Sequence, residues 1–259
     1  MKQTDIQKQP DSRGIRIDRV GVSGFKMSIV VAEKTKNVPT VGEFEIAVEL
    51  AANIKGIHMS RFFEVITKYE RKKIDRKSIE EILREIKMRM GSQEAKLAIE
   101  FVYFMTKKAP MSAISSIMSY KCKISSKLNS KNDISIFVEV NIPVSSVCPC
   151  SKHISKEGAH NQRGLVTAKV KVEEINLGRL IKEVEKAGSQ ELYTLLKRKD
   201  EKYVTEAMFD NPKFVEDIAR DAKIILQKNK YHFEVIKCIN NESIHDHNVY
   251  AEIRGEIGE

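Results

Sequence analysis

Two thiols and an imidazole stand close together in the middle of this 259-residue chain, between Cys148 and Arg163. Cys148 and Cys150 flank a single proline, and His160 follows within Gly-Ala-His-Asn-Gln-Arg. Thiolate and imidazole are ligands of zinc and related divalent ions. A pair of small buried thiols is the alternative, but Pro149 and the polar residues after Cys150 fit a core poorly. The pattern predicts a site in which one thiol can bind a metal ion while the other acts as an acid or base.

Basic residues accompany these thiols and suggest an anionic ligand. Lys152 and Arg163 lie in the same segment, which follows an apolar, strand-like run and is predicted to be a loop at a strand end. A second segment contains His58 and Arg61. It reads either as an ordinary loop with Ser60 as N-cap, or as a helix N-terminus that receives phosphate.

Carboxylates and further imidazoles supply a second group of candidate ligands. Glu242, His245 and His247 lie near the start of a predicted strand. There they could share a face and converge on one cation, or they could form an exposed polar turn. Glu201 and Glu216 belong to acidic segments that composition alone assigns to the solvated surface.

Composition bounds the class of protein. The chain carries 45 Lys and Arg against 36 Asp and Glu, has a net charge of +9, and contains no Trp. A lysine-rich surface, a polyanion partner or a small phosphorylated substrate fits this charge, but without a basic-aromatic motif we expect no nucleic-acid partner. No apolar run approaches the ~20 residues of a membrane span and no signal peptide is evident, so we expect no membrane association. Four cysteines, two of them nearly adjacent, indicate reduced thiols and a cytoplasmic protein.

The hydrophobic pattern predicts an α+β fold with antiparallel sheets. Alternation over residues 41–50 predicts a half-buried strand. Helices are expected over 60–69 and 78–90, the second with Ser78 as N-cap and Gly91 as its stop signal. Further strands are expected over 97–106, 114–128, 133–144, 164–172, 231–239 and 248–253, and further helices over 177–187, 190–197 and 211–227.

The order of elements suggests two modules. Residues 1–12 are expected to be a flexible N-terminus. Residues 13–145 and 146–259 each follow the order strand, helices, strands, which predicts an N-terminal and a C-terminal module of α+β type.

Taken together, the motifs resemble the type IB GTP cyclohydrolases, a prokaryotic family. Any one of them is weak, but their order along almost the whole chain is specific. Lys199, Ser28 and Asp246 depart from the family pattern without removing a proposed ligand. The matching segments are Asp18–Val22, Lys55–Arg61, Cys148–Lys152, Gly158–Arg163, Leu195–Arg198, Asp200–Glu206, Asn211–Asp217 and Glu242–His245.

The resemblance implies a fold, an assembly and a reaction. The fold would be a tunnelling fold, with two modules of antiparallel sheet and helices packed on one face. Subunits would form homotetramers with interfacial active sites. The reaction would convert GTP and water to formate and 7,8-dihydroneopterin triphosphate, the first step toward tetrahydrofolate and, in many bacteria, queuosine. An archaeal relative makes a cyclic phosphate instead, so that product stays an alternative.

The resemblance also implies roles for individual residues. Cys148, Glu201 and His245 would be the main ligands of one divalent ion, Zn, Mn or Fe(II), with Glu242 and His160 as further candidates. Cys150 would give or take a proton beside the guanine ring, with His160 as a further catalytic candidate. Glu216 would read the guanine edge. The residues that could hold the triphosphate are Lys152, Arg163, His58 and Arg61.

Two other functions compete with this interpretation. A non-catalytic, zinc-containing polyanion-binding protein would use the net positive charge and a closed four-ligand zinc site. A nitrile reductase of the same fold would act on a deazaguanine with a nucleophilic cysteine and NADPH. The reductase would not need a metal ion, and the pairing of Glu242 with His245 argues against it.

Overall fold

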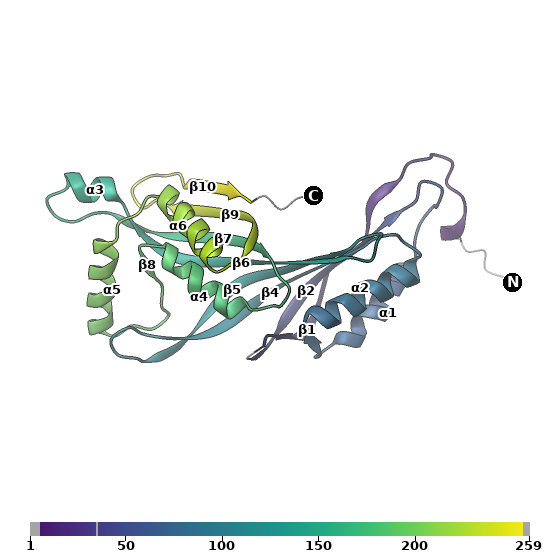
Figure 1. Cartoon of the computed structure of the whole chain (residues 1–259), viewed down its shortest axis with the longest axis horizontal. Helices are drawn as coiled ribbons and strands as arrows, with labels where there is room; N and C mark the ends of the chain where they lie inside the picture. The colour runs from purple at the N-terminus through teal and green to yellow at the C-terminus, as the bar shows by residue number, and fades with distance from the viewer. Residues whose placement is uncertain (1–5, 35, 256–259) are drawn as a thin grey trace. The chain divides into compact units, whose positions relative to one another are not determined.

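The computed structural model describes residues 6–34 and 36–255 of the chain and confirms the expected α+β class (Figure 1). The chain folds into two compact units. Unit 1 comprises Met1–Phe101, Lys123–Phe137 and Glu173–Ile175, and unit 2 comprises Val102–Cys122, Val138–Val172 and Asn176–Glu259. The predicted cut between residues 145 and 146 differs from this division, because three long strands contribute residues to both units.

Unit 1 is a mostly antiparallel sheet accompanied by helices. Its strands follow the order β3, β1, β2, β4, β5 and β6, and α1 and α2 lie beside them (Figure 1). The alternation predicted over residues 41–50 is confirmed, since Phe44, Ile46 and Val48 are buried. The bounds are β1 (Ile17–Ala32), β2 (Asn37–Leu50), α1 (Ser60–Ile66), η2 (Thr67–Tyr69), β3 (Lys73–Ile74), α2 (Arg76–Met90), β4 (Ala95–Lys108), β5 (Ser115–Leu128) and β6 (Ile134–Val147).

Unit 2 contains the second halves of β4 and β6 and the first half of β5, and it carries the cysteine segment. Its sheet follows the order β4, β5, β6, β7, β9 and β10, with β8 paired to β6. Helix α6 packs on β9 and β10, and α4 packs on α6. The bounds are α3 (Pro149–Ile154), β7 (Asn161–Lys171), α4 (Leu177–Val184), η3 (Glu185–Ala187), β8 (Gln190–Glu191), α5 (Arg198–Asp210), α6 (Val215–Lys228), β9 (His232–Asn241) and β10 (Val249–Arg254).

Three predicted helix starts are wrong. The N-cap of α2 is Asp75 and not Ser78: the Asp75 carboxylate accepts the Ser78 N–H, and the Ser78 hydroxyl accepts the Asp75 N–H, both at 2.8 Å. Gly91 ends the helix with φ 64°, as predicted. No helix covers residues 190–197; the helix follows at Arg198, where Asp200 supports its first turn. The predicted helix from residue 211 starts later, at Val215.

The N-terminal segment is attached over its described part. Helix η1 (Ile6–Lys8) and the residues that follow it pair through their backbone with residues 53–56. Lys55 and Gly56 donate their N–H groups to the carbonyls of Gln9 and Gln7, at 3.2 and 3.1 Å. The segment thereby supplies partners for the backbone of a loop, while the flexible terminus expected for residues 1–12 stays a prediction. Residues 1–5 of that prediction lie outside the described residues.

Candidate active site

The cysteine segment is a closed loop at the end of β6. The strand ends at Val147, and Cys148 becomes the N-cap of α3, with its Sγ accepting the Ser151 N–H at 3.4 Å. The chain returns to its start, because the Cys148 N–H donates to the His160 carbonyl at 3.1 Å. The His160 N–H donates to the Ser151 hydroxyl at 3.1 Å. These bonds hold Cys148 and the backbone of His160 at the base of one loop, and the loop follows a strand end as the sequence predicted.

A buried glutamine joins His160 to the second predicted cluster. His160 Nδ1 lies 3.1 Å from Oε1 of Gln162, and Nε2 of Gln162 donates to Oε1 of Glu242 at 3.2 Å. Since Gln162 presents its oxygen to the ring, the proton of a neutral His160 belongs on Nδ1, and Nε2 keeps its lone pair. Ser243 adds a hydroxyl 3.4 Å from the same Nδ1. The end of β9 is thereby tied to the cysteine loop.

The late histidines lie in a turn and not in a strand. His245 and His247 occupy bends between β9 and β10, and β10 starts only at Val249, so the predicted shared strand face is wrong. Their rings nevertheless stack, with centroids 5.1 Å apart and planes 15° from parallel. Nδ1 of His247 lies 3.4 Å from the Asp246 carboxylate. Both imidazoles are exposed.

Glu201 lies in the first turn of α5, beside a buried carboxylate. Asp200 accepts the backbone N–H groups of Met111, Ser112 and Lys197 at 2.8, 2.7 and 2.9 Å. Burial opposes the ionisation of Asp200, but hydrogen bonds from Ser112, Lys197 and Met111 outweigh it and hold the pKa of that carboxyl below its usual range. Asp200 thus ties the start of α5 to the turn between β4 and β5. The neighbouring Glu201 side chain is exposed.

Glu216 lies in the first turn of α6, and its side chain is exposed. Among the residues that the structure describes, no hydrogen bond or ion pair engages its carboxylate. The segment before it is held firmly, because Lys213 donates its backbone N–H to the Val147 carbonyl at 3.0 Å. Val147 directly precedes Cys148, so the start of α6 lies against the base of the cysteine loop.

The four predicted phosphate-binding residues lie in different settings. Lys152 donates to the Phe209 carbonyl at the end of α5, and its Nζ lies 4.4 Å from the centroid of the Phe209 ring. Arg163 is exposed on β7, which starts three residues earlier than predicted. His58 and Arg61 belong to unit 1, where Nη1 of Arg61 donates to the carbonyl of Arg89 in the last turn of α2, at 2.9 Å. Lys152 and Arg61 therefore have structural contacts of their own.

The predicted metal ligands are only partly brought together. Hydrogen bonds connect Cys148, His160 and Glu242 through one network. In the described part of the chain, no group of three or more His, Cys, Asp or Glu side chains is close enough to hold a metal ion. The donor chemistry still fits one, because thiolate, imidazole and carboxylate together suit Zn, Mn or Fe(II). Glu201 and His245 are exposed donors on separate elements of unit 2.

Sequence reasoning missed three residues that organise this region. Gln162, Asp200 and Lys213 received no role, although each stands inside one of the matching segments or directly at its start. The available signal was local: an amide two residues after a histidine, and a carboxylate directly before a proposed ligand. The sequence could not identify the distant hydrogen-bond partners. Glu242 lies 80 residues from Gln162, and Met111 lies 89 residues from Asp200.

Known proteins resemble this chain over almost its whole length. A family model described as type I GTP cyclohydrolase folE2 matches residues 3–251. A GTP cyclohydrolase FolE2 of Geotalea uraniireducens (strain Rf4) is 43% identical over 253 residues, covering 96% of this chain and 92% of that protein. A GTP cyclohydrolase FolE2 of Thermosipho africanus (strain TCF52B) is 42% identical over 258 residues, covering 98% and 99%.

A solved structure supports the fold independently of sequence. The uricase of Arthrobacter globiformis has a TM-score of 0.50 and 8% sequence identity, covering 93% of this chain and 95% of that chain. At that identity the likeness speaks to the fold alone, and together with the sheet and helices described above it bears out the expected tunnelling fold. No helix among the described residues is long and apolar enough to cross a membrane.

Proposed function

The chain belongs to the FolE2 family of type I GTP cyclohydrolases, and on this premise we propose that it converts GTP and water to formate and 7,8-dihydroneopterin triphosphate. Relatives that are 40–43% identical over nearly the full length support this enzyme activity in folate biosynthesis. The observation within the structure that carries the proposal is the network joining Cys148, His160 and Glu242. It holds the backbone of Cys148 against that of His160 and links the His160 ring to the Glu242 carboxylate through Gln162.

One divalent ion would be held by Cys148, Glu201 and His245, with Glu242 and His160 as further candidates. When bound, such an ion lowers the pKa of a coordinated water to about 7, which makes hydroxide available near neutral pH. The chain's own contribution is the orientation of the donors. Gln162 orients the His160 ring through Nδ1, and the same side chain donates to the carboxylate of Glu242.

The remaining roles concern protons and selectivity. Cys150 is exposed in α3, two residues after Cys148, and would give or take a proton at the imidazole ring of guanine. His160 is the second candidate for that task. Glu216 would accept the N1–H and N2–H groups of guanine as a bidentate pair, which adenine cannot offer. Arg163, Lys152, His58 and Arg61 are the candidates for the triphosphate.

A homotetramer with interfacial sites is part of the proposal. The exposed side chains of Cys150, Glu201, Glu216 and His245 in one chain support it, because they are accessible to residues of a neighbouring subunit. Use of the product for queuosine as well as folate is likewise proposed. Four free thiols support a cytoplasmic location.

The test is anaerobic incubation of the purified, metal-stripped chain with GTP and with Zn, Mn or Fe(II) in turn. We expect formate and a pterin that becomes fluorescent after oxidation, with at least one metal and not without metal. The mass of the product separates the linear triphosphate from the cyclic phosphate. Binding of GTP without formate release under every metal condition would refute the enzyme and favour a polyanion-binding protein.

A pair of cysteine variants makes the test specific to the loop. Cys148→Ala should lose metal and activity while remaining folded. Cys238→Ala is the matched control, since burial raises the pKa of the Cys238 thiol to about 12 and keeps it protonated in the core. This control should retain both metal and turnover. Equal losses in the two variants would mean that the effect of Cys148→Ala is structural.

A further inference from the structure

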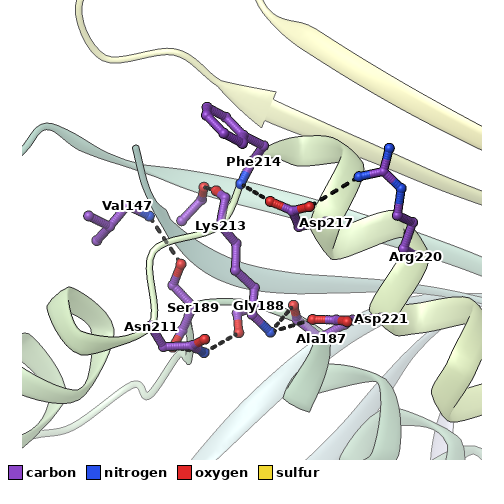
Figure 2. Close-up of polar contacts among 11 residues, drawn as sticks. Val147, Ala187, Gly188, Ser189, Asn211, Lys213, Phe214, Asp217, Arg220 and Asp221 are labelled. Atoms are coloured by element: carbon purple, nitrogen blue, oxygen red, sulfur yellow. Dashed lines mark hydrogen bonds and ion pairs between the residues drawn. The ribbon is translucent and has the colours of Figure 1, made fainter. Parts of the chain in front are cut away.

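The connection between α5 and α6 is held by its backbone at the end of β6. Lys213 donates its N–H to the Val147 carbonyl at 3.0 Å and accepts the Ser146 hydroxyl on its own carbonyl at 2.9 Å. The N–H of Val147 donates in turn to the hydroxyl of Ser189, at 3.1 Å (Figure 2). Backbone groups on both sides of the connection are therefore satisfied within unit 2, which fixes the path of the chain into α6.

Side chains of the connection bind a second segment, residues 187–189. The Asn211 amide donates to the carbonyls of Gly188 and Ser189 at 3.3 and 3.0 Å. Nζ of Lys213 donates to the Ala187 carbonyl at 3.0 Å (Figure 2). Three consecutive carbonyls of this turn are thus bonded by two side chains.

Lys213 also reaches α6 itself. Its Nζ lies 2.7 Å from Oδ2 of Asp221, and its side chain is 13% exposed, whereas that of Asp221 is 40% exposed. On the other side of the helix start, Asp217 accepts the Phe214 N–H at 3.1 Å and pairs with Arg220 at 3.1 Å. The Lys213–Asp221 pair connects the helix to the rest of the unit. The Asp217–Arg220 pair only connects residues of the same helix.

The first turn of α6 carries Glu216, whose carboxylate is exposed and held by the helix alone. A carboxylate reads two adjacent donors only when both oxygens lie in the plane of the base, so the position of this turn decides the quality of the contact. We propose that Lys213 is a positioning residue that sets the guanine-reading carboxylate of Glu216, and that it makes no contact with the triphosphate. This inference rests on the proposed role of Glu216.

The ammonium group of Lys213 is already engaged. A carbonyl and a carboxylate occupy it on two sides, and the side chain is largely buried, which leaves it poorly suited to bind a triphosphate. Loss of the Lys213 ammonium would free the start of α6 to shift. A shift of about 1 Å in a binding group costs on the order of 100-fold in rate. The rate should fall most for GTP, because GTP uses both carboxylate oxygens of Glu216.

The experiment compares GTP with inosine triphosphate, which lacks the exocyclic amine. Steady-state kcat/KM is measured for both substrates with the metal-loaded wild type, Lys213→Met, Glu216→Gln and the double variant. Lys213→Met should lower kcat/KM for GTP by about 10- to 100-fold and reduce the preference for GTP by at least about fivefold. In the Glu216→Gln background the same substitution should change the preference by less than about twofold, because the residue it acts through is gone.

Matched variants separate positioning from general stability. Arg220→Ala removes the exposed ion pair of the same helix turn and should leave the preference unchanged. Asp221→Asn removes the carboxylate of the Lys213–Asp221 ion pair at its more exposed end. It should shift the preference for GTP over inosine triphosphate in the same direction as Lys213→Met. This variant keeps the test valid should Lys213→Met fail to fold. Metal content should equal that of the wild type in every variant.

Three results would overturn the inference. One is a lower Tm for Lys213→Met while the preference for GTP over inosine triphosphate stays that of the wild type. Lys213 would then stabilise the fold without positioning Glu216. Another is a change in preference that is equally large with and without Glu216→Gln, since that rules out action through Glu216. The third is an unchanged preference in Glu216→Gln itself, which removes the proposed role of Glu216 and with it the premise, and so is distinguishable from a failure of Lys213 alone.

Discussion

A buried ion cluster supports the segment on which the start of α6 rests, and it permits a quantitative prediction. Nζ of Lys107, at the end of β4, lies 2.8 Å from Oε1 of Glu185 and 2.9 Å from Oε2 of Glu191. The Tyr120 hydroxyl donates to the same oxygen of Glu185 at 2.7 Å. Lys107 and Glu185 are 8% and 2% exposed. Burial raises the pKa of Glu185 even though Lys107 opposes that rise.

Lys107→Met removes the cation and leaves the buried carboxylate of Glu185 without a counter-charge. Breaking one side of a buried pair costs about 3–5 kcal/mol, because the remaining charge keeps its desolvation penalty. Glu191 adds less, since it is 29% exposed and can be hydrated. We expect the free energy of unfolding to fall by about 3–5 kcal/mol at pH 7.

Urea unfolding followed by far-UV circular dichroism measures this loss. All variants are compared at one protein concentration, because assembly of subunits stabilises the folded chain by mass action. Lys123→Met is the matched control: its ion pair with Glu100 spans 2.8 Å, but Glu100 is 62% exposed. An exposed pair of this kind contributes about 0–1 kcal/mol.

The pH dependence follows from the direction of the Glu185 pKa. A carboxyl whose pKa is raised in the folded state binds more protons folded than unfolded, so stability falls as pH rises from the ordinary value of 4.5. Removing Lys107 raises that pKa further. The difference between wild type and Lys107→Met should therefore be largest near neutral pH and shrink below about pH 4.5, where Glu185 is neutral in both states of the variant.

A second substitution checks the cause. Glu185→Gln in the Lys107→Met background removes the uncompensated charge while keeping an acceptor for Tyr120, and it should restore most of the lost stability. A loss below about 1 kcal/mol for Lys107→Met would refute the reasoning, because it would place the pair in the range of exposed ones. Absence of recovery in the double variant would show that packing, and not charge, accounts for the loss.

The remaining predictions concern the site. Cys150→Ala should retain most of the metal that Cys148→Ala loses, yet lose turnover; metal analysis beside a GTP assay checks this, and equal metal loss in both would contradict the division of roles. Glu216→Gln replaces one acceptor with a donor, so kcat/KM for GTP should fall by about 30- to 1,000-fold with metal content unchanged; near-normal kinetics would remove the residue from the site. Asp200→Asn should lower Tm at pH 7. The pKa of Asp200 is depressed in the folded chain, so the carboxylate stabilises the fold above about pH 4 and this stabilisation is lost as pH falls. The Tm difference between wild type and variant should therefore narrow in acid. A Tm difference independent of pH would refute the role of the charge.

Much of the fold was predictable because local patterns agree with the final structure. Alternation in β2, β4, β5 and β6 matches the faces that are buried, and Gly91 ends α2 as its position suggested. The N-cap of α2 was a local error, three residues off, whereas the start of α5 is decided by a distant partner. Helix α5 starts at Arg198 because Asp200 satisfies its first turn while also binding the turn between β4 and β5. Nothing local distinguishes that aspartate from a solvated one.

The candidate site divides in the same way. Which chemistry is present can be read from the amino-acid sequence: the thiols of Cys148 and Cys150, the imidazole of His160 and the carboxylates, in an order that identifies the family. Side-chain chemistry and order are properties of the chain alone, so they needed no coordinates. They could not say that Lys152 contacts the end of α5.

The folded chain settles which of these groups meet and which are held in place. It joined His160 to Glu242 through Gln162, which is 80 residues from Glu242 along the chain. It also placed Lys213 against Val147 and Asp221, next to the helix turn that carries Glu216. The physical reason is that a hydrogen bond acts over about 3 Å, whereas sequence separation sets no such distance until the sheet brings its strands into register.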